Sequence, residues 1–197
     1  LTSITIPENV TSIEASAFSG CVALTSITIP ENVTSIEEST FYGCKALTSI
    51  TIPENVTSIG HSAFSNCVAL TSITIPENVT SIGNYSFEYC YSLTSIIIPN
   101  NVTSIGEYAF YYCKELTSIT IGDGVKEIPY FLCYKCTKLS EVIIGKNVKT
   151  LFGGCFCLGK DTYIDKFYCY ASNPPEMVRD WSNDFDYYPF EYGYDNT

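Results

Sequence analysis

The sequence repeats itself every 23 residues. Residues 1–23 read LTSITIPENVTSIEASAFSGCVA, and residue 24 begins the pattern again as LTSITIPENVTSIEESTFYGCKA. Further copies begin at residues 47, 70, 93 and 116, and a more divergent copy begins at residue 139. A fixed period of this length is typical of a solenoid, in which each repeat is one coil that contacts only its neighbours. The chain is therefore predicted to have no single central core.

Apolar residues recur at fixed positions of the repeat, which we number 1 to 23 from its leucine. Position 1 is Leu, position 6 is Ile and position 10 is Val in all seven copies. Position 4 is Ile or Val, position 13 is Ile or Leu, position 18 is Phe except at Cys133, and position 21 is Cys except at Gly159. One repeat cannot bury its own apolar edge, but stacked copies can bury each side chain against its counterpart.

The spacing inside the repeat predicts the path of each coil. Positions 4 and 6 have the alternation of a strand, with the Ser and Thr of positions 3 and 5 facing the other way. Pro at position 7 ends the strand because it has no N–H to donate, and Glu-Asn at positions 8 and 9 forms a polar turn. Positions 14–20 are predicted to form one or two turns of helix, held by burial of the Phe and Cys. The expected product is a right-handed, curved α/β solenoid with a parallel sheet on the concave face and short helical turns outside.

The full pattern, L-x-x-I-x-I-P-x-x-V-x-x-I-x-x-x-A-F-x-x-C, resembles the BspA-like leucine-rich repeats, also described as the treponemal class. The resemblance covers residues 1–161 and implies a right-handed leucine-rich repeat solenoid. Proteins of this kind are typically secreted or attached to the surface of host-associated bacteria, and some are adhesins for host matrix proteins. The resemblance thus implies an extracellular or cell-surface module that binds a host or cell-surface protein or glycan. The alternative is a structural spacer that projects another domain of a larger surface protein.

Three segments divide the chain. Residues 1–161 hold the seven repeats, residues 162–175 are predicted to form a final strand and a Pro-Pro turn, and residues 176–197 are acidic and aromatic. A solenoid needs its last apolar face covered, so a cap or docking segment is preferred to a disordered tail for residues 176–197. Leu1 falls on the first position of a repeat and no initiator Met is present, which suggests a longer precursor.

Charge and hydropathy exclude some partners. The net charge of −11 argues against nucleic acid, whose binding depends on Lys and Arg at phosphates. No apolar run approaches the ~18 residues of a membrane span. The lysines gather toward the C-terminal end, with eight in residues 114–171 against one in residues 1–113. This distribution is interpreted as solvated surface, with a partner-binding gradient as the alternative. The chain is expected to be a monomer.

The cysteines are predicted to be structural. Position-21 cysteines share one inward site, where neighbours are expected to miss disulfide geometry, so they are interpreted as free, buried apolar filler. Cys133, Cys136, Cys155 and Cys157 have spacings close to those of a four-thiolate zinc site. However, Cys157 is expected to face outward from position 19, so the four should not converge. A local disulfide that involves Cys155, Cys157 or Cys169 is a further alternative.

Other polar residues carry no clear catalytic signal. His61 is the only histidine and lies at a polar outer position without the orienting partner that a catalytic base needs. Position 8 forms a file of Glu8, Glu31, Glu54 and Glu77, which is interpreted as a solvated rim rather than a calcium site. Asn-Val-Thr is an N-glycosylation pattern, but turn formation is the simpler role. No enzyme activity, cofactor or metal is therefore expected. The Asn-Val-Thr motifs begin at Asn9, Asn32, Asn55, Asn78 and Asn101, and Asn84 begins one further pattern of this type.

The outward side chains of the predicted strands form the candidate ligand-contact surface. A selective ligand needs a local feature, because a uniform repeated surface offers several equivalent registers. Ile97, Glu141 and Ile143 replace the usual Thr and Ser, so selective contact is predicted near them, with packing under the C-terminal segment as the alternative. The complete predicted surface is Ser3, Thr5, Ser26, Thr28, Ser49, Thr51, Ser72, Thr74, Ile97, Ser118, Thr120, Glu141 and Ile143.

Overall fold

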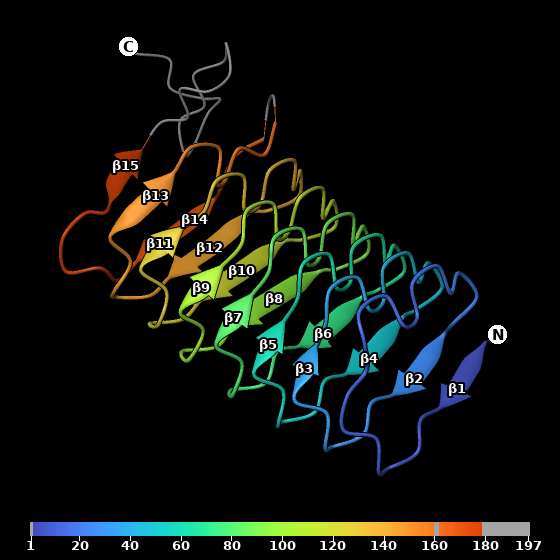
Figure 1. Cartoon of the computed structure of the whole chain (residues 1–197). Coiled ribbons are helices and arrows are strands. Elements are labelled where there is room, and N and C mark those ends of the chain that lie inside the picture. The colour runs from blue at the N-terminus through green and yellow to red at the C-terminus, as the bar shows by residue number, and fades with distance from the viewer. Residues whose placement is uncertain (1, 160–161, 179–197) are drawn as a thin grey trace.

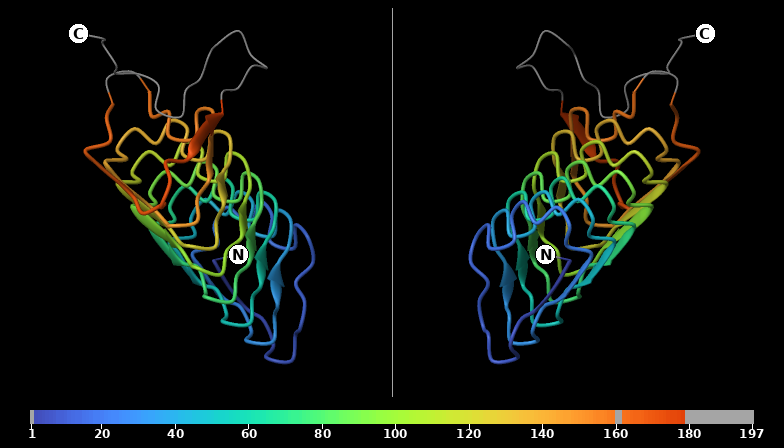
Figure 2. Two further views of the ribbon diagram at one scale, coloured as in Figure 1. Left: turned by 90° about the vertical axis from the view of Figure 1, so that its left-hand side faces the viewer. Right: turned by 90° about the vertical axis from the view of Figure 1, so that its right-hand side faces the viewer.

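The computed structural model describes residues 2–159 and 162–178, and these residues form a stack of coils in chain order (Figure 1). Each of the seven repeats makes one coil. An eighth coil follows, because β14 (Lys166–Cys169) pairs with β12 (Glu141–Ile144) of coil 7, and β15 (Glu176–Val178) pairs with β13 (Thr150–Phe152) of the same coil. The successive coils overlie one another in both views of Figure 2. The parallel-sheet solenoid predicted from the 23-residue period is confirmed.

Positions 3–6 of the coils form the strands that we call the front sheet. In coils 1–7 the pairings are parallel and in register at the repeat period, as in Ser3↔Ser26 and Thr120↔Ile143. Coil 8 also pairs in parallel, but at a longer spacing, as in Glu141↔Lys166. Strands β1, β2, β4 and β6 form one four-stranded sheet, and β8, β10, β12 and β14 form another. The strands are β1 (Ser3–Thr5), β2 (Ser26–Thr28), β4 (Ser49–Thr51), β6 (Ser72–Thr74), β8 (Ser95–Ile98), β10 (Ser118–Ile121), β12 (Glu141–Ile144) and β14 (Lys166–Cys169).

A second set of parallel strands, at positions 12 and 13, forms what we call the side sheet. These strands were not predicted from the sequence, because each is only two or three residues long, although the Val-Thr-Ser-Ile alternation is compatible with a strand. The first sheet of this set joins β3 (Ser35–Ile36), β5 (Ser58–Ile59), β7 (Ser81–Ile82) and β9 (Ser104–Ile105). The second joins β11 (Glu127–Ile128), β13 (Thr150–Phe152) and β15 (Glu176–Val178).

The prediction of short helical turns at positions 14–20 is wrong, since no residue that the structure describes is helical. Positions 16 and 20 adopt left-handed backbone angles in coil after coil, as at Ser62 (φ 52°) and Asn66 (φ 61°). A right-handed helix cannot continue through such residues. Instead, N–H groups donate to the following coil, as from Phe41 to the Ala63 carbonyl at 2.8 Å. The outer wall is thus built from turns hydrogen-bonded to one another along the stack.

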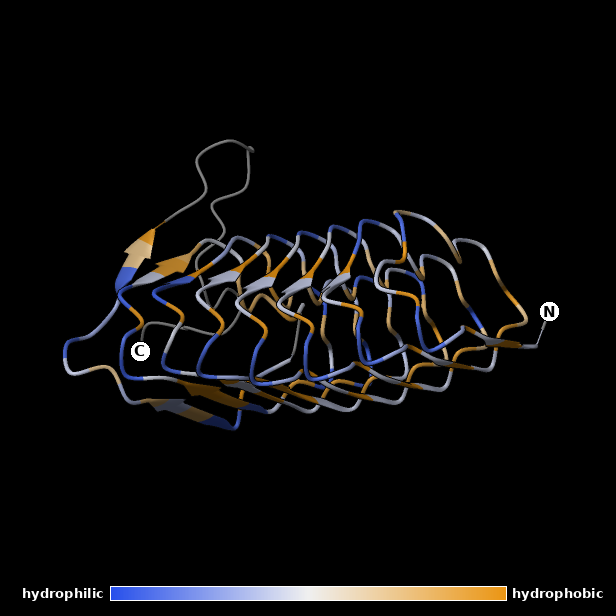
Figure 3. Ribbon diagram, turned by 60° about the horizontal axis from the view of Figure 1, so that its bottom comes forward, coloured by the Kyte–Doolittle hydropathy of each residue, from blue (hydrophilic) through white to orange (hydrophobic). Residues whose placement is uncertain are grey.

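The core lies between the sheets and these turns and is a file of identical side chains. The position-18 rings stack with centroids 5.2–5.5 Å apart from Phe18 to Phe110. This spacing is close to the ~4.8 Å between strands, so the outer wall is only slightly longer than the sheet. Figure 3 shows hydrophobic strand segments and hydrophilic turns recurring along the stack. The core runs the length of the solenoid.

None of the ten cysteines forms a disulfide, which confirms the prediction for the position-21 cysteines and contradicts a local disulfide at Cys155, Cys157 or Cys169. From Cys44 to Cys136 each position-21 thiol donates to the carbonyl of the preceding coil's position 18, as from Cys67 to Phe41 at 3.1 Å. Cys21 is only half-buried. The position predicted for Cys157 is wrong, because its side chain is fully buried. In coil 7 the second positive φ of the turn lies at Gly159, at position 21, instead of at position 20 as in the other six coils.

Candidate binding surface

The predicted ligand-contact residues lie on the outer face of the front sheet. In coils 1–4 the Ser and Thr of positions 3 and 5 are all exposed, and they form two uniform rows of hydroxyl groups. In coils 6 and 7 the corresponding residues, Ser118, Thr120, Glu141 and Ile143, are half-buried. The structure therefore divides the front sheet into a uniform hydroxyl part and a more varied C-terminal part.

An apolar row crosses the C-terminal part of the front sheet. Ile97, Thr120, Ile143 and Tyr168 occupy position 5 on four adjacent strands and pair in register. Ile97 is 67% exposed and Tyr168 is 43% exposed. Burial of apolar surface is the main favourable term in association, so this row can contribute to binding. We call these four residues the apolar row.

Tyr168 was not among the predicted contact residues, because the repeat period fails before β14. Ile143 pairs with Tyr168, which lies 25 residues further along the chain instead of 23. Because of these two extra residues, counting 23 positions from Ile143 does not lead to Tyr168. Only the strand pairing brings Tyr168 into the row.

Two opposite charges flank the apolar row at position 3. Glu141 and Lys166 lie on neighbouring strands, and their carboxylate oxygen and ammonium nitrogen are 4.0 Å apart. Both side chains are substantially exposed, so the pair contributes little to stability. Its position beside Ile143 and Tyr168 gives the C-terminal part of the front sheet a polar edge.

The turn face of coils 4–6 carries a tyrosine cluster that sequence reasoning did not identify as a group. Tyr85 and Tyr108 at position 16 stack with centroids 5.0 Å apart, and Phe131 continues the stack at 4.9 Å. Burial of the phenol raises the pKa of Tyr111 to about 12. Lys114 lies over the ring of Tyr91 at 4.9 Å. The rings pack against one another along the stack, so much of their aromatic surface is in contact with other rings of the protein and is not accessible to a ligand.

The Asn-Val-Thr motifs have a structural role. The Asn32 side-chain amide donates to the Glu8 carbonyl of the preceding coil at 3.1 Å, and Asn55, Asn78 and Asn101 repeat this bond at 2.7–2.8 Å. Each of these amide nitrogens therefore already satisfies a backbone acceptor. This supports a turn-stabilising role for the asparagines.

The position-8 file and His61 lie where the sequence predicts. Glu8, Glu31, Glu54 and Glu77 are exposed on one rim. Further along this file Asp123 accepts an N–H from Lys146 and forms an ion pair with its ammonium at 2.9 Å, and these hydrogen bonds lower the pKa of Asp123. His61 is exposed and contacts the edge of Tyr85. Over residues 2–159 and 162–178 no group of three or more potential metal ligands is assembled.

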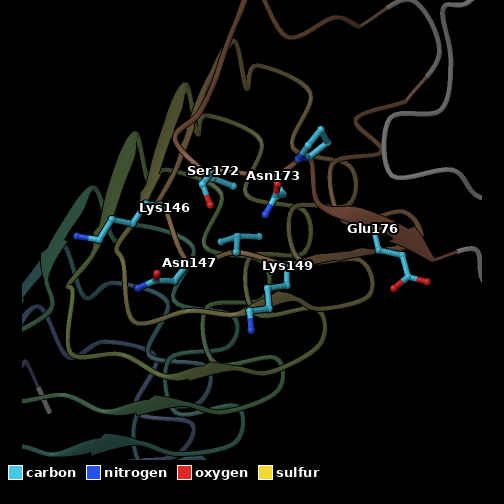
Figure 4. A pocket seen from close by; sticks show the side chains of 9 residues that line it. Lys146, Asn147, Lys149, Ser172, Asn173 and Glu176 are labelled. Carbon is cyan, nitrogen blue, oxygen red and sulfur yellow. The ribbon is translucent and has the colours of Figure 1, made fainter.

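A polar hollow of about 320 Å³ lies beside the loop between β14 and β15 (Figure 4). Lys146, Asn147 and Lys149 of coil 7 line one part of it, and Ser172 and Asn173 of the loop line another. Lys146 is already paired with Asp123. Small-molecule sites are predominantly apolar, so this hollow is a weaker candidate than the apolar row.

Comparison with known proteins agrees with this architecture. The family model for the BspA type leucine rich repeat region matches residues 1–91 and 80–167 in six copies. A solved leucine rich repeat protein of T. pallidum is 30% identical with a TM-score of 0.71, over 80% of this chain and 78% of that one. No curated protein matches this sequence.

Two further solved structures are similar. A leucine-rich repeat protein of Bacteroides ovatus is 32% identical with a TM-score of 0.78 and is matched over 88% of this chain. This chain spans only 45% of that protein. A leucine rich cell surface protein of Faecalibacterium prausnitzii is 25% identical with a TM-score of 0.52, over 81% of this chain and 66% of that one. In the described part of the chain no helix is long and apolar enough to cross a membrane. The family match covers most of the sequence, and the chain therefore belongs to the BspA-type leucine-rich repeat family.

Proposed function

We propose that this protein is a non-enzymatic binding module that acts outside the cell or on its surface. It binds a protein or glycan with the C-terminal part of its front sheet. The F. prausnitzii protein of similar fold is described as a cell surface protein, which supports this location. The proposal involves no cofactor, metal, nucleic acid or second copy of the chain.

The observation that carries the proposal is the apolar row. Ile97 exposes 67% of its surface on a sheet whose other outward residues in coils 1–4 are Ser and Thr. A ligand on the uniform rows could shift by one coil without changing its contacts, whereas the apolar row exists in one place. Binding energy usually concentrates in a few apolar or aromatic anchors. Ile97, Ile143 and Tyr168 are the anchors of this surface.

Binding to immobilised extracellular matrix proteins and glycans tests the proposal. Ile97→Thr and Ile143→Thr each restore the residue found at the same position in other coils, so neither should disturb the fold. We expect each to weaken binding by about tenfold, the effect of losing ~1.4 kcal/mol of contact. Thr28→Ala, at the same position in coil 2, is the matched control and should bind like the parent.

A structural spacer is the alternative function, and the uniform faces of coils 1–4 favour it because they offer no distinct contact. A spacer has no ligand of its own. Equal binding by the parent, both Ile variants and the control, with all four folded, would reject the apolar row as the binding site. Absence of binding by the parent to every immobilised ligand would favour the spacer.

A further inference from the structure

The side sheet is interrupted between coils 5 and 6. In the part of the chain that the structure describes, β9 ends one sheet, β11 begins another, and the two strands do not pair. In coils 3–5 the position-14 N–H donates to the previous coil, as from Gly106 to the Ile82 carbonyl at 2.8 Å. Position 14 of coil 6 is Pro129, which has no N–H to donate. Pro129 therefore removes one of the hydrogen bonds that would join coils 5 and 6 at this point.

Coil 6 also lacks a second coil-to-coil bond at this point. The asparagine at position 9 binds the preceding coil in coils 2–5 and again in coil 7, where Asn147 donates to the Asp123 carbonyl at 2.8 Å. Coil 6 has Gly124 at this position, which has no side chain to donate. Coil 6 thus departs from the repeat at two positions, and each departure removes a hydrogen bond to coil 5. We call this junction between coils 5 and 6 the seam.

A cavity of about 450 Å³ lies at this seam. Small-ligand sites have volumes of ~300–1,000 Å³, so it can take one or two sugar-sized rings. Tyr130 and Phe152 form an aromatic wall, with ring centroids 4.8 Å apart and planes inclined by 47°. Glu107, Glu127 and Lys126 supply charged groups around the same space. The cavity therefore combines an apolar wall with hydrogen-bonding groups.

Gly106, which has no side chain, also lines the cavity. A Cβ at Gly106 would lie 2.2 Å from the Asn84 backbone nitrogen, so coils 4 and 5 approach too closely for a side chain there. Pro129 and Phe152 occupy the same position 14 in coils 6 and 7 and line the cavity together with Gly106. Position 14 therefore changes at this junction from glycine in coils 3–5 to larger side chains in coils 6 and 7.

We propose that this cavity binds a neutral saccharide. A sugar ring has one face of C–H groups and a rim of hydroxyl groups. The C–H face suits the Tyr130 and Phe152 rings, since C–H groups form weak contacts with aromatic faces. The rim hydroxyls can donate to the carboxylates of Glu107 and Glu127 and accept from the ammonium of Lys126. Two carboxylates beside one ammonium repel an anionic ligand, so the ligand class is neutral. The site lies on the side sheet and does not rest on the function proposed for the front sheet.

Saturation-transfer NMR of the whole chain with lactose, cellobiose, maltose and mannobiose tests the site, with sialyllactose as an acidic comparison. We expect at least one neutral disaccharide to bind with a dissociation constant of about 1 mM or tighter. Tyr130→Asn places the residue of coil 4 at the same position, and Glu107→Gln removes only a charge. Each should weaken binding about tenfold. Glu38→Gln changes the matched position of coil 2, which does not line this cavity, and should have no effect.

Three results would overturn the inference: no saturation transfer to any neutral disaccharide, transfer to sialyllactose alone, or equal binding by the parent, Tyr130→Asn and Glu107→Gln. Circular dichroism and thermal unfolding establish that each variant is folded before binding is compared. Ile97→Thr should leave saccharide binding at this cavity unchanged, which separates this site from the front sheet.

Discussion

At the scale of single residues, most buried side chains in this protein contact a copy of themselves. Phe64 lies between Phe41 and Phe87 with centroid distances of 5.4 and 5.3 Å, and it is completely buried. Thr51, on the front sheet of the same coil, is exposed. Coil 3 therefore contains one residue at which substitution should strongly lower the stability of the protein and one at which it should have little effect on stability.

Phe64→Ala should lower the free energy of unfolding by about 3–5 kcal/mol, because it leaves a cavity inside the ring stack. Thr51→Ala should change the free energy of unfolding by no more than about 0.5 kcal/mol, as is usual for surface sites. Urea unfolding followed by circular dichroism measures both. Equal losses at the two sites would mean that the inward and outward faces have been assigned the wrong way round.

The thiols should differ sharply in reactivity. Burial raises the pKa of Cys44 to about 11 and also raises the pKa values of Cys67 and Cys90, and the thiolate is the reactive form. In the native protein at about pH 8, iodoacetamide should therefore label the exposed Cys169 first and the half-buried Cys21 next. The remaining cysteines should react only after denaturation. Mass spectrometry identifies the labelled sites, and a native Cys44–Cys67 crosslink would contradict the geometry described above.

The asparagine bonds should contribute measurably to stability. Asn78→Ala removes the amide that donates to the Glu54 carbonyl at 2.8 Å. We expect a loss of about 1 kcal/mol, the usual net value of such a hydrogen bond. Asn9→Ala is the matched control, since the structure gives Asn9 no such bond. If both variants lose the same stability in urea unfolding, the asparagines act through local turn geometry instead.

At the scale of elements, the outer wall depends on left-handed residues instead of helices. Position 20 is left-handed in six coils and is occupied by Gly20, Gly43, Asn66, Tyr89, Tyr112 and Lys135. A Cβ on Gly43 would meet only atoms of Gly20 at 3.9 Å, so space is not limiting there. At Gly43 the backbone angle, and not the available space, therefore sets the expected cost of a side chain.

Gly43→Ala should cost about 1–2 kcal/mol, the conformational penalty of an ordinary residue in the left-handed region. Gly43→Asn should cost less, because asparagine tolerates this region and Asn66 adopts it at the same position of coil 3. Thermal unfolding of the two variants provides the comparison. A similar melting temperature for parent and Gly43→Ala would show that this turn is not held in the left-handed conformation.

At the scale of the whole molecule, the coils are close to interchangeable, because contacts join mainly neighbouring coils in the same register. The exceptions lie in coils 6–8, where the side sheet is interrupted and two extra residues enter before β14. The protein should therefore tolerate the removal or insertion of a complete N-terminal coil, but not of a C-terminal coil.

Removal of residues 47–69, one complete repeat, should leave a folded solenoid with a lower urea midpoint, because coil 2 then stacks on coil 4 with every position matched. Removal of residues 47–58, about half a repeat, should abolish folding, since strands would then face turns. Circular dichroism and size-exclusion chromatography distinguish the two outcomes. A folded half-repeat deletion would show that register is not set by the period.

Much of the candidate site could be predicted from the sequence. Ile97 and Ile143 stand out by comparison with their own copies, and period-2 alternation assigns them to the outer face. Tyr168 could not be found in this way, because its register depends on strand pairing after the period has failed. The predicted cap in residues 176–197 lies largely outside the described residues, apart from β15, and stays a prediction.

The sequence by itself determined the solenoid, the front sheet and the inward positions, because identical residues at a fixed period can be buried only by stacking. The tertiary structure decided the conformation of positions 14–20. Seven residues could form a short helix or hydrogen-bonded turns, and bonds to the next coil, such as Phe41 to Ala63, favour the turns. It also decided where the side sheet breaks. Pro129 has no N–H and Gly124 has no side-chain amide, so neither can donate a hydrogen bond to coil 5, and this matters only once the coils are stacked. The local sequence determines which backbone conformations a residue favours. Contacts with neighbouring coils, about 23 residues away in the chain, select one of these conformations.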